Sequence, residues 1–134
     1  MPGALAQSTR TTPERQEVTE PGTPSSLLVL WTTGDRITAL DMALMYGLNA
    51  KVKDWWDEVT LLIWGASQTL VVEDSEVRDK VAELGYAGVR VVACRKCAEN
   101  LGLKDQLTEM GCEVFYVGEF LTDWLKSGRT VLTV

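Results

Sequence analysis

The chain of 134 residues contains no histidine, and this absence excludes more chemistry than any other feature of its composition. Without an imidazole, the chain cannot by itself form a Ser-His-Asp triad, a Cys-His dyad or a histidine-liganded zinc site. Any catalysis must therefore use thiols, carboxylates, amines, hydroxyls or backbone dipoles.

Basic residues are also in short supply, with 13 Lys and Arg against 19 Asp and Glu and a formal net charge of −6. This sign opposes binding to a phosphate backbone, so we expect no direct contact with nucleic acid. No apolar run approaches the roughly 18 residues that a membrane span needs, and residues 1–16 lack the apolar stretch of a signal peptide. We therefore expect a cytoplasmic protein that does not bind a membrane.

Proline occurs only four times, and all four residues lie within the first 24 positions. Residues 1–26 combine these prolines with Thr, Ser, Gln and Glu and show no helical or strand periodicity, which predicts a disordered leader. Residues 27–134 contain no proline and have the length of a single domain. We therefore expect one folded unit that begins near residue 27.

Short apolar segments alternate with longer segments of helical spacing throughout this unit. Strands are predicted over residues 27–31, 59–64, 89–93, 113–117 and 130–134. Helices are predicted between them, over residues 35–48, 75–85, 95–110 and 120–126. Because each crossover has about ten residues or more, the strands are expected to be parallel. The predicted fold is α/β, a three-layer α/β/α sandwich with a five-stranded parallel sheet.

The first predicted helix is apolar on two sides. Its inner stripe is expected to consist of Ile37, Leu40, Leu44 and Leu48. Outside this stripe lie further large side chains of the helix and two adjacent indoles that follow it: Met42, Met45, Tyr46, Trp55 and Trp56. Either neighbouring helices wrap this segment, or it forms an interface between copies of the chain. We expect a homo-oligomer.

Ligands of open parallel sheets bind beyond the carboxyl ends of the strands. Of the segments that follow the predicted strands, only residues 94–97 contain a thiol. Cys94 is expected to cap the next helix, whose unpaired N–H groups favour a thiolate. Cys97 lies one turn further, and Arg95 and Lys96 add positive charge nearby, as substrate-docking groups. We therefore expect Cys94 and Cys97 to be the reactive residues and Cys94 to be accessible.

Other residues of the same edge have smaller predicted roles. Ser67 and Gln68 are expected to offer hydrogen bonds to a small polar or anionic group on the sulfur, and Gly118 follows the fourth strand. Cys112 precedes that strand, so we expect it on the opposite edge in a packing role. One Cys-x-x-Cys pair without histidine leaves a structural zinc site incomplete, so we predict neither a metal nor a cofactor.

Four segments of the chain, residues 91–102, 111–118, 120–128 and 131–133, resemble the DsrE/DsrF-like family in their order and spacing. The resemblance covers residues 27–134. It implies an α/β/α fold, homotrimers or hexamers, and a cysteine after the third strand that carries sulfane sulfur as a persulfide. That cysteine corresponds to Cys94. Cys97 is a departure, because the well-known carriers of the family rely on the one cysteine at the Cys94 position.

These observations favour a sulfur-relay protein that acts as a persulfide carrier or sulfurtransferase. In this reading Cys94 takes sulfur from a donor protein and passes it to an acceptor protein. Two alternatives stay open. The Cys94 and Cys97 pair can instead cycle as a thiol–disulfide oxidoreductase, or the chain can be a non-catalytic oligomeric module that binds a small ligand. In the last case both cysteines are small apolar core residues.

Overall fold

A computed structural model describes residues 24–134. Its strands are β1 (Ser26–Trp31), β2 (Glu58–Ile63), β3 (Arg90–Cys94), β4 (Glu113–Phe115) and β5 (Thr130–Thr133). Its helical segments are α1 (Arg36–Thr38), η1 (Ala39–Ala43), α2 (Leu44–Val52), α3 (Ala66–Glu73), α4 (Ser75–Tyr86), α5 (Arg95–Leu101), α6 (Lys104–Glu109) and α7 (Gly118–Lys126).

The five strands form one parallel sheet in the order β4-β3-β2-β1-β5, which confirms the predicted fold class. Apolar side chains occupy both faces of the central strands, as the continuous apolar runs of a doubly covered sheet require. In register, Val29 of β1 pairs with Leu61 of β2, which in turn pairs with Val91 of β3. The carboxyl ends of all strands therefore meet at one edge of the sheet.

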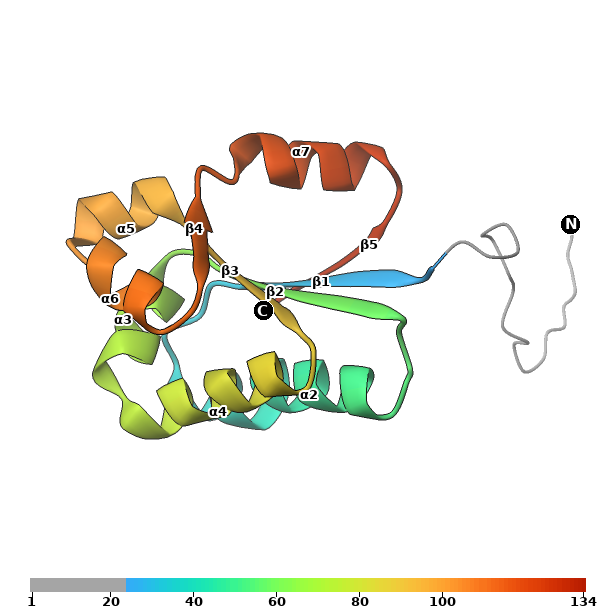
Figure 1. Ribbon diagram of the computed structural model, residues 1–134, viewed down its shortest axis with the longest axis horizontal. Helices are drawn as coiled ribbons and strands as arrows, with labels where there is room; N and C mark the ends of the chain where they lie inside the picture. Colours follow the sequence, from blue (N-terminus) through green and yellow to red (C-terminus); the bar gives the residue numbers. More distant parts are fainter. Residues whose placement is uncertain (1–23) are drawn as a thin grey trace, which may run out of the picture.

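Helices cover both faces of the sheet (Figure 1). Helices α2 and α4 lie side by side on one face, below the sheet in this view, and α7 lies on the other face. Helices α3, α5 and α6 gather beside the sheet at the left of the view. Of these, α3 begins three residues after β2, and α5 follows β3 directly. The edge that the sequence marks for a site is thus built from α3, α5 and the strand ends.

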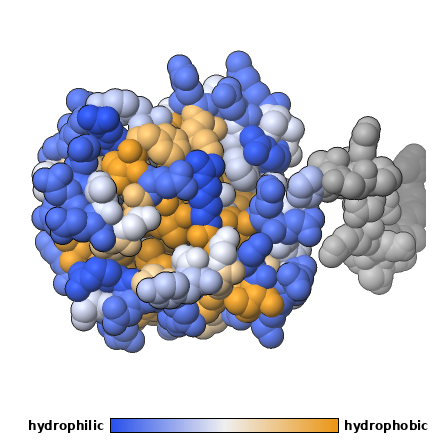
Figure 2. Space-filling model, viewed as in Figure 1, coloured by the Kyte–Doolittle hydropathy of each residue, from blue (hydrophilic) through white to orange (hydrophobic). Residues whose placement is uncertain are grey.

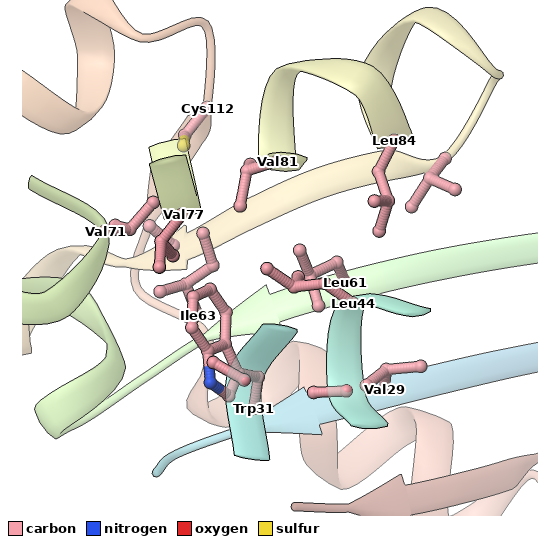
Figure 3. Packing of buried hydrophobic residues seen from close by; sticks show 14 of the residues in the cluster. Val29, Trp31, Leu44, Leu61, Ile63, Val71, Val77, Val81, Leu84 and Cys112 are labelled. Carbon is pink, nitrogen blue, oxygen red and sulfur yellow. The ribbon is translucent and has the colours of Figure 1, made fainter. Parts of the chain in front are cut away.

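The buried side chains form two clusters, one on each face. The α4-side core includes Val29, Trp31, Leu44, Leu61, Ile63, Val71, Val77, Val81, Leu84 and Cys112 (Figure 3). The α7-side core consists of Leu28, Leu62, Val92, Cys94, Val117 and Trp124. Neighbouring residues of one strand point to opposite faces, so Leu61 and Leu62 belong to different cores.

The first helix is interrupted by a π-helical turn, η1, and this changes which residues face the sheet. The prediction that Ile37 belongs to the inner stripe is wrong, because its side chain is 67% exposed, whereas Leu44 is fully buried. A π turn contains more residues than an α turn, so residues before and after it lose their common face. The small residues Ala39 and Ala43 fill the buried positions instead.

Two boundaries differ from those predicted. Residues 1–23 of the predicted leader lie outside the described residues, but Ser25 and Ser26 belong to the domain. The backbone N–H of Ser25 donates to Asp57, and Ser26 begins β1. Residues 66–73, over which the sequence predicts no helix, form the helix α3, which opens at Gly65 with a left-handed φ of 87°. Among residues 24–134, no helix combines the length and the apolar character that crossing a membrane requires.

Candidate functional site

Cys94 is the N-cap of α5, as predicted, and it is also the last residue of β3, one residue beyond the predicted end of that strand. Its backbone is extended, with φ −69° and ψ 120°, so the chain changes from strand to helix at this residue. No side-chain cap holds the start of α5. The sulfur therefore sits at the carboxyl edge of the sheet, the place where open α/β folds bind their ligands.

The structure differs from the sequence expectation in the exposure of this thiol. Cys94 is only 3% exposed and belongs to the α7-side core, with Leu62, Val92 and Trp124. Side-chain alternation along β3 directs residues 92 and 94 to the same face, and that face lies under α7. Cys94 is therefore buried because its side chain points into this core.

Cys97 is the more accessible thiol of the pair. It lies in the first turn of α5 and is half-buried against the α7-side core. Its Sγ lies 4.0 Å from the carbonyl oxygen of Gly65, in the segment between β2 and α3. Both Cys94 and Cys97 are free thiols. Cys97 is thus more exposed to solvent than Cys94.

Aromatic side chains cover this face around Cys94. Phe115 of β4 pairs in register with Cys94, and its ring makes an edge-to-face contact with Phe120 of α7 at a centroid distance of 5.6 Å. The guanidinium of Arg90 lies 5.4 Å from the centroid of the Phe120 ring and donates two hydrogen bonds to Glu113. Both Phe115 and Phe120 are half-buried. These two rings, called the aromatic cover below, pack against the α7-side core to which Cys94 belongs.

Ser67 and Gln68, predicted to bind substrate, are both fully buried in the first turn of α3. The Ser67 hydroxyl donates to the carbonyl of Trp31 at 2.6 Å. The Gln68 amide donates to the carbonyls of Ile63 and Cys94, each at 3.0 Å. Their donors are therefore engaged with strand-end carbonyls, and Gln68 is directly bound to the candidate cysteine.

Arg95 is held by groups that the sequence analysis did not identify. Its guanidinium donates to Glu99 at 3.0 Å and lies 4.9 Å from the centroid of the Tyr116 ring. The Tyr116 hydroxyl also donates to Glu99, and the hydrogen bond from Arg95, followed by that from Tyr116, lowers the pKa of the Glu99 carboxyl. The i,i+4 spacing of Arg95 and Glu99 could have predicted this pair. Lys96, in contrast, is exposed, and its predicted role in docking stays a prediction.

Gly118 lies after β4, as predicted, but as the first residue of α7. Its carbonyl accepts a hydrogen bond from the Thr122 hydroxyl at 2.8 Å, and the residue is exposed. An added Cβ would meet nothing within 4 Å. Its predicted role toward a substrate stays a prediction.

Cys112 provides a contrast within the same chain. It is buried in the α4-side core just before β4, on the opposite edge from Cys94, as expected for a packing residue. Burial raises the pKa of the Cys112 thiol to about 11. This sulfur stays protonated at neutral pH and is a poor nucleophile. Within residues 24–134, no group of three or more metal-ligating side chains converges.

A groove of about 870 Å³ lies away from the cysteine pair, between α4, the start of β3 and the end of α6. Its apolar lining includes Val81, Val91 and Met110, and Figure 2 shows apolar surface in the middle of this face, framed by hydrophilic side chains. None of the predicted site residues is among those that line it.

A five-stranded parallel sheet with a cysteine at the carboxyl end of its third strand defines the class of this protein. The chain belongs to the DsrE/DsrF-like family, whose model matches residues 28–134. It is similar to BT1422 from Bacteroides thetaiotaomicron, a conserved protein of unknown function. The two chains share 37% identity and a TM-score of 0.80, over 82% of this chain and 95% of the other.

Two more distant structures share the fold. The ychN protein of E. coli has 18% identity and a TM-score of 0.63, and MTH1491 of Methanobacterium thermoautotrophicum, a protein of unknown function, has 17% and 0.64. In both cases 84% of this chain and all of the other are covered. No curated protein matches the chain.

Proposed function

We propose that this protein is a sulfur carrier that holds sulfane sulfur on Cys94 and exchanges it with donor and acceptor proteins. The observation that carries the proposal is the place of Cys94, at the junction of β3 and α5 with a second free thiol one turn away. The family of the chain supports it, because sulfur-relay proteins belong to that family. The negative net charge of −6 agrees with protein partners rather than nucleic acid.

The difference in burial between the two thiols suggests an order of steps. The Cys97 thiolate attacks the outer sulfur of a donor persulfide, the donor S–S bond breaks, and the donor leaves as a thiolate. The Cys94 thiolate then attacks the outer sulfur of the Cys97 persulfide, which forms the Cys94 persulfide and returns Cys97 as a thiolate. Each step exchanges one S–S bond for another, so no oxidant or reductant is needed.

The burial of Cys94 protects the sulfur that it receives in the second step. A persulfide under Phe115 and Phe120 is shielded from water and from small thiols, since the α7-side core surrounds it. Release requires the aromatic cover to move, and the half-buried Phe120 is the side chain that can move without disturbing the sheet. Lys96, exposed beside Cys97, provides a contact for an acidic partner surface.

Mass spectrometry after treatment with a polysulfide tests the proposal. We expect a mass increase of one sulfur on the peptide that contains Cys94, and none on the peptide that contains Cys112. Cys94→Ser is expected to abolish stable loading, whereas Cys97→Ser is expected to slow it. The proposal is wrong if Cys94→Ser holds as much sulfur as the parent chain.

The pair of thiols three residues apart also supports thiol–disulfide exchange as a second candidate. If Cys94 attacks the inner sulfur of the Cys97 persulfide, a disulfide forms and hydrosulfide leaves. Titration with a redox buffer distinguishes the two functions. An oxidoreductase gives a reversible two-electron transition that requires both cysteines, whereas a carrier retains its sulfur as a persulfide.

We further propose that the chain forms a homo-oligomer, a trimer or hexamer, through the outer side of α2. Met42, Met45 and Trp55 are 39%, 48% and 52% exposed, and Trp55 contacts Tyr46 at a ring distance of 5.8 Å. Trp56 instead turns inward and donates to the Tyr46 hydroxyl. Light scattering is expected to give a multiple of the 14.8 kDa chain mass, and Met45→Lys is expected to reduce it. A parent chain that is monomeric at high concentration contradicts this.

A further inference from the structure

Gln68 is a fully buried polar residue that joins two strand ends. It is the third residue of α3, and its Nε2 donates to the carbonyl oxygen of Ile63, the last residue of β2, and to that of Cys94, the last residue of β3. Both distances are 3.0 Å. One amide therefore uses both of its N–H groups where the two central strands leave the sheet.

The orientation of this amide follows from its partners. Backbone carbonyls only accept hydrogen bonds, so the nitrogen of the Gln68 amide must face them. The Oε1 atom is left buried and has no hydrogen-bond partner among the described residues. An unpartnered buried oxygen is unfavourable, and an apolar side chain of similar size would fill the space without it. The two donated hydrogen bonds are thus the feature that distinguishes glutamine from methionine or leucine at this position.

We infer that Gln68 is a positioning residue that fixes the backbone of Cys94 and favours its thiolate form. The carbonyl oxygen of Cys94 carries a partial negative charge and, by covalent geometry, lies within a few ångströms of the sulfur of the same residue. The Gln68 N–H group offsets that charge and prevents the carbonyl from turning.

Ser67 supplies a matched control. It is the neighbouring residue of the same helical turn and is equally buried. Its hydroxyl donates to the carbonyl of Trp31, at the end of β1, and more weakly to that of Trp64 at 3.3 Å. Ser67 thus ties α3 to other strand ends without touching β3. A change at either residue loosens the carboxyl edge of the sheet, but only Gln68 donates a hydrogen bond to Cys94.

The experiment is the alkylation of the full-length chain by iodoacetamide over a range of pH, with each cysteine followed by peptide mass spectrometry. Cys112, on the opposite edge, is the internal reference for global unfolding. For Gln68→Met, we expect the midpoint of the Cys94 pH profile to rise by roughly a few tenths of a pH unit, because the lost N–H group lies near the sulfur but bonds to the carbonyl in both protonation states. For Ser67→Ala, we expect the midpoint to stay where it is in the parent chain.

The shape of the pH profile distinguishes a positioning role of Gln68 from a general loosening of the structure around Cys94. Local opening multiplies the Cys94 rate equally at every pH, whereas a less stable thiolate moves the midpoint. An unmoved midpoint in Gln68→Met, or an equal movement in Ser67→Ala, overturns the inference. If Gln68→Met does not fold by circular dichroism, Gln68→Asn replaces it, because the shorter amide cannot reach both carbonyls and predicts the same rise.

The inference rests on the proposed role of Cys94 in sulfur carriage, but the two fail separately. Alkylation measures the thiolate without any sulfur donor. If the midpoint moves in Gln68→Met but the parent chain never takes up sulfur, Gln68 is still a positioning residue, for another thiol chemistry. If the parent chain loads sulfur on Cys94 but the midpoint does not move in Gln68→Met, the carrier function stands and the role of Gln68 is wrong.

Discussion

Leu61 and Leu62 are neighbours in β2 and are both fully buried, yet they lie in layers of different construction. Leu61 packs in the α4-side core, which two long helical segments close with aliphatic side chains (Figures 1 and 3). Leu62 packs in the α7-side core, which a helix of nine residues closes with aromatic rings.

Cys112 and Cys94 also lie in different cores. Cys112 lies in the α4-side core and is kept protonated by burial, whereas Cys94 lies in the α7-side core at the edge beside a second thiol. Arg90 and Arg129 stack on the aromatic rings of the α7 side. The two cysteines are thus both buried, but they differ in their surroundings: aliphatic side chains surround Cys112, and aromatic rings and a second thiol lie near Cys94.

The largest expected effect is on stability in the α4-side core. Leu61→Ala is expected to lower the free energy of unfolding by about 3 kcal/mol, because two packed helices cannot close the cavity. Leu62→Ala, its matched control, is expected to cost about 2 kcal/mol, since α7 can move inward. Urea denaturation of both variants checks the order, and equal costs contradict the distinction between the layers.

The next effect concerns access to Cys94. Phe120→Ala removes part of the aromatic cover and is expected to raise the alkylation rate of Cys94 about tenfold, as a loss of about 1.4 kcal/mol of local packing would do. The rate of Cys112 is expected to stay unchanged. Leu125→Ala, on the exposed side of the same helix, serves as control. A tenfold rise in the control as well would mean that α7 as a whole has loosened.

A smaller effect is expected at the start of α4. Asp74 caps this helix, and the hydrogen bond from Arg36, followed by that from the Val77 N–H, lowers the pKa of the Asp74 carboxyl. A lowered carboxyl pKa stabilises the fold above the unfolded value near 4, and this stability is lost as the pH falls through the folded value. Asp74→Asn keeps a capping oxygen but removes the charge. Its melting temperature is therefore expected to lie below the parent's at pH 7, and the difference is expected to shrink as the pH falls through the lowered pKa of Asp74.

The smallest effect is expected at the surface of the α7 side. Glu113→Gln breaks the ion pair with Arg90, in which both side chains are about half exposed. Exposed ion pairs contribute little, so we expect a loss of about 0.5 kcal/mol or less, which high salt further reduces. Urea denaturation at two salt concentrations measures this. A loss as large as that of Leu62→Ala would show that the pair supports the aromatic cover.

Most of the fold could be predicted because its strands are apolar at nearly every position and proline is absent from the domain. The cap at Asp74 and the strand-end place of Cys94 also follow from local sequence. The helix α3 could not be predicted as easily, because its eight residues include buried polar side chains in place of an apolar stripe. Residues 65–68 therefore resemble a turn.

The burial of Cys94 depends on tertiary structure. Local sequence places Cys94 at a strand end. It does not show which face of the sheet the side chain points to, or that α7 lies on that face. The exposure of Ile37 has a similar origin, because the π-helical turn η1 changes the phase of the helix. In both cases the outcome depends on backbone geometry and packing that local sequence does not show.

Helix α2 packs against α4, and its buried residues include the small Gly47 and Ala50. A Cβ at Gly47 would approach the Leu84 side chain to 3.2 Å, so Leu84 of α4 packs directly against the backbone of α2 at this position. Such packing leaves little freedom for the pair to slide or rotate. Any surface that docks onto Met45 and Trp55 consequently meets a rigid template, and little conformational entropy remains to be lost when the two come together.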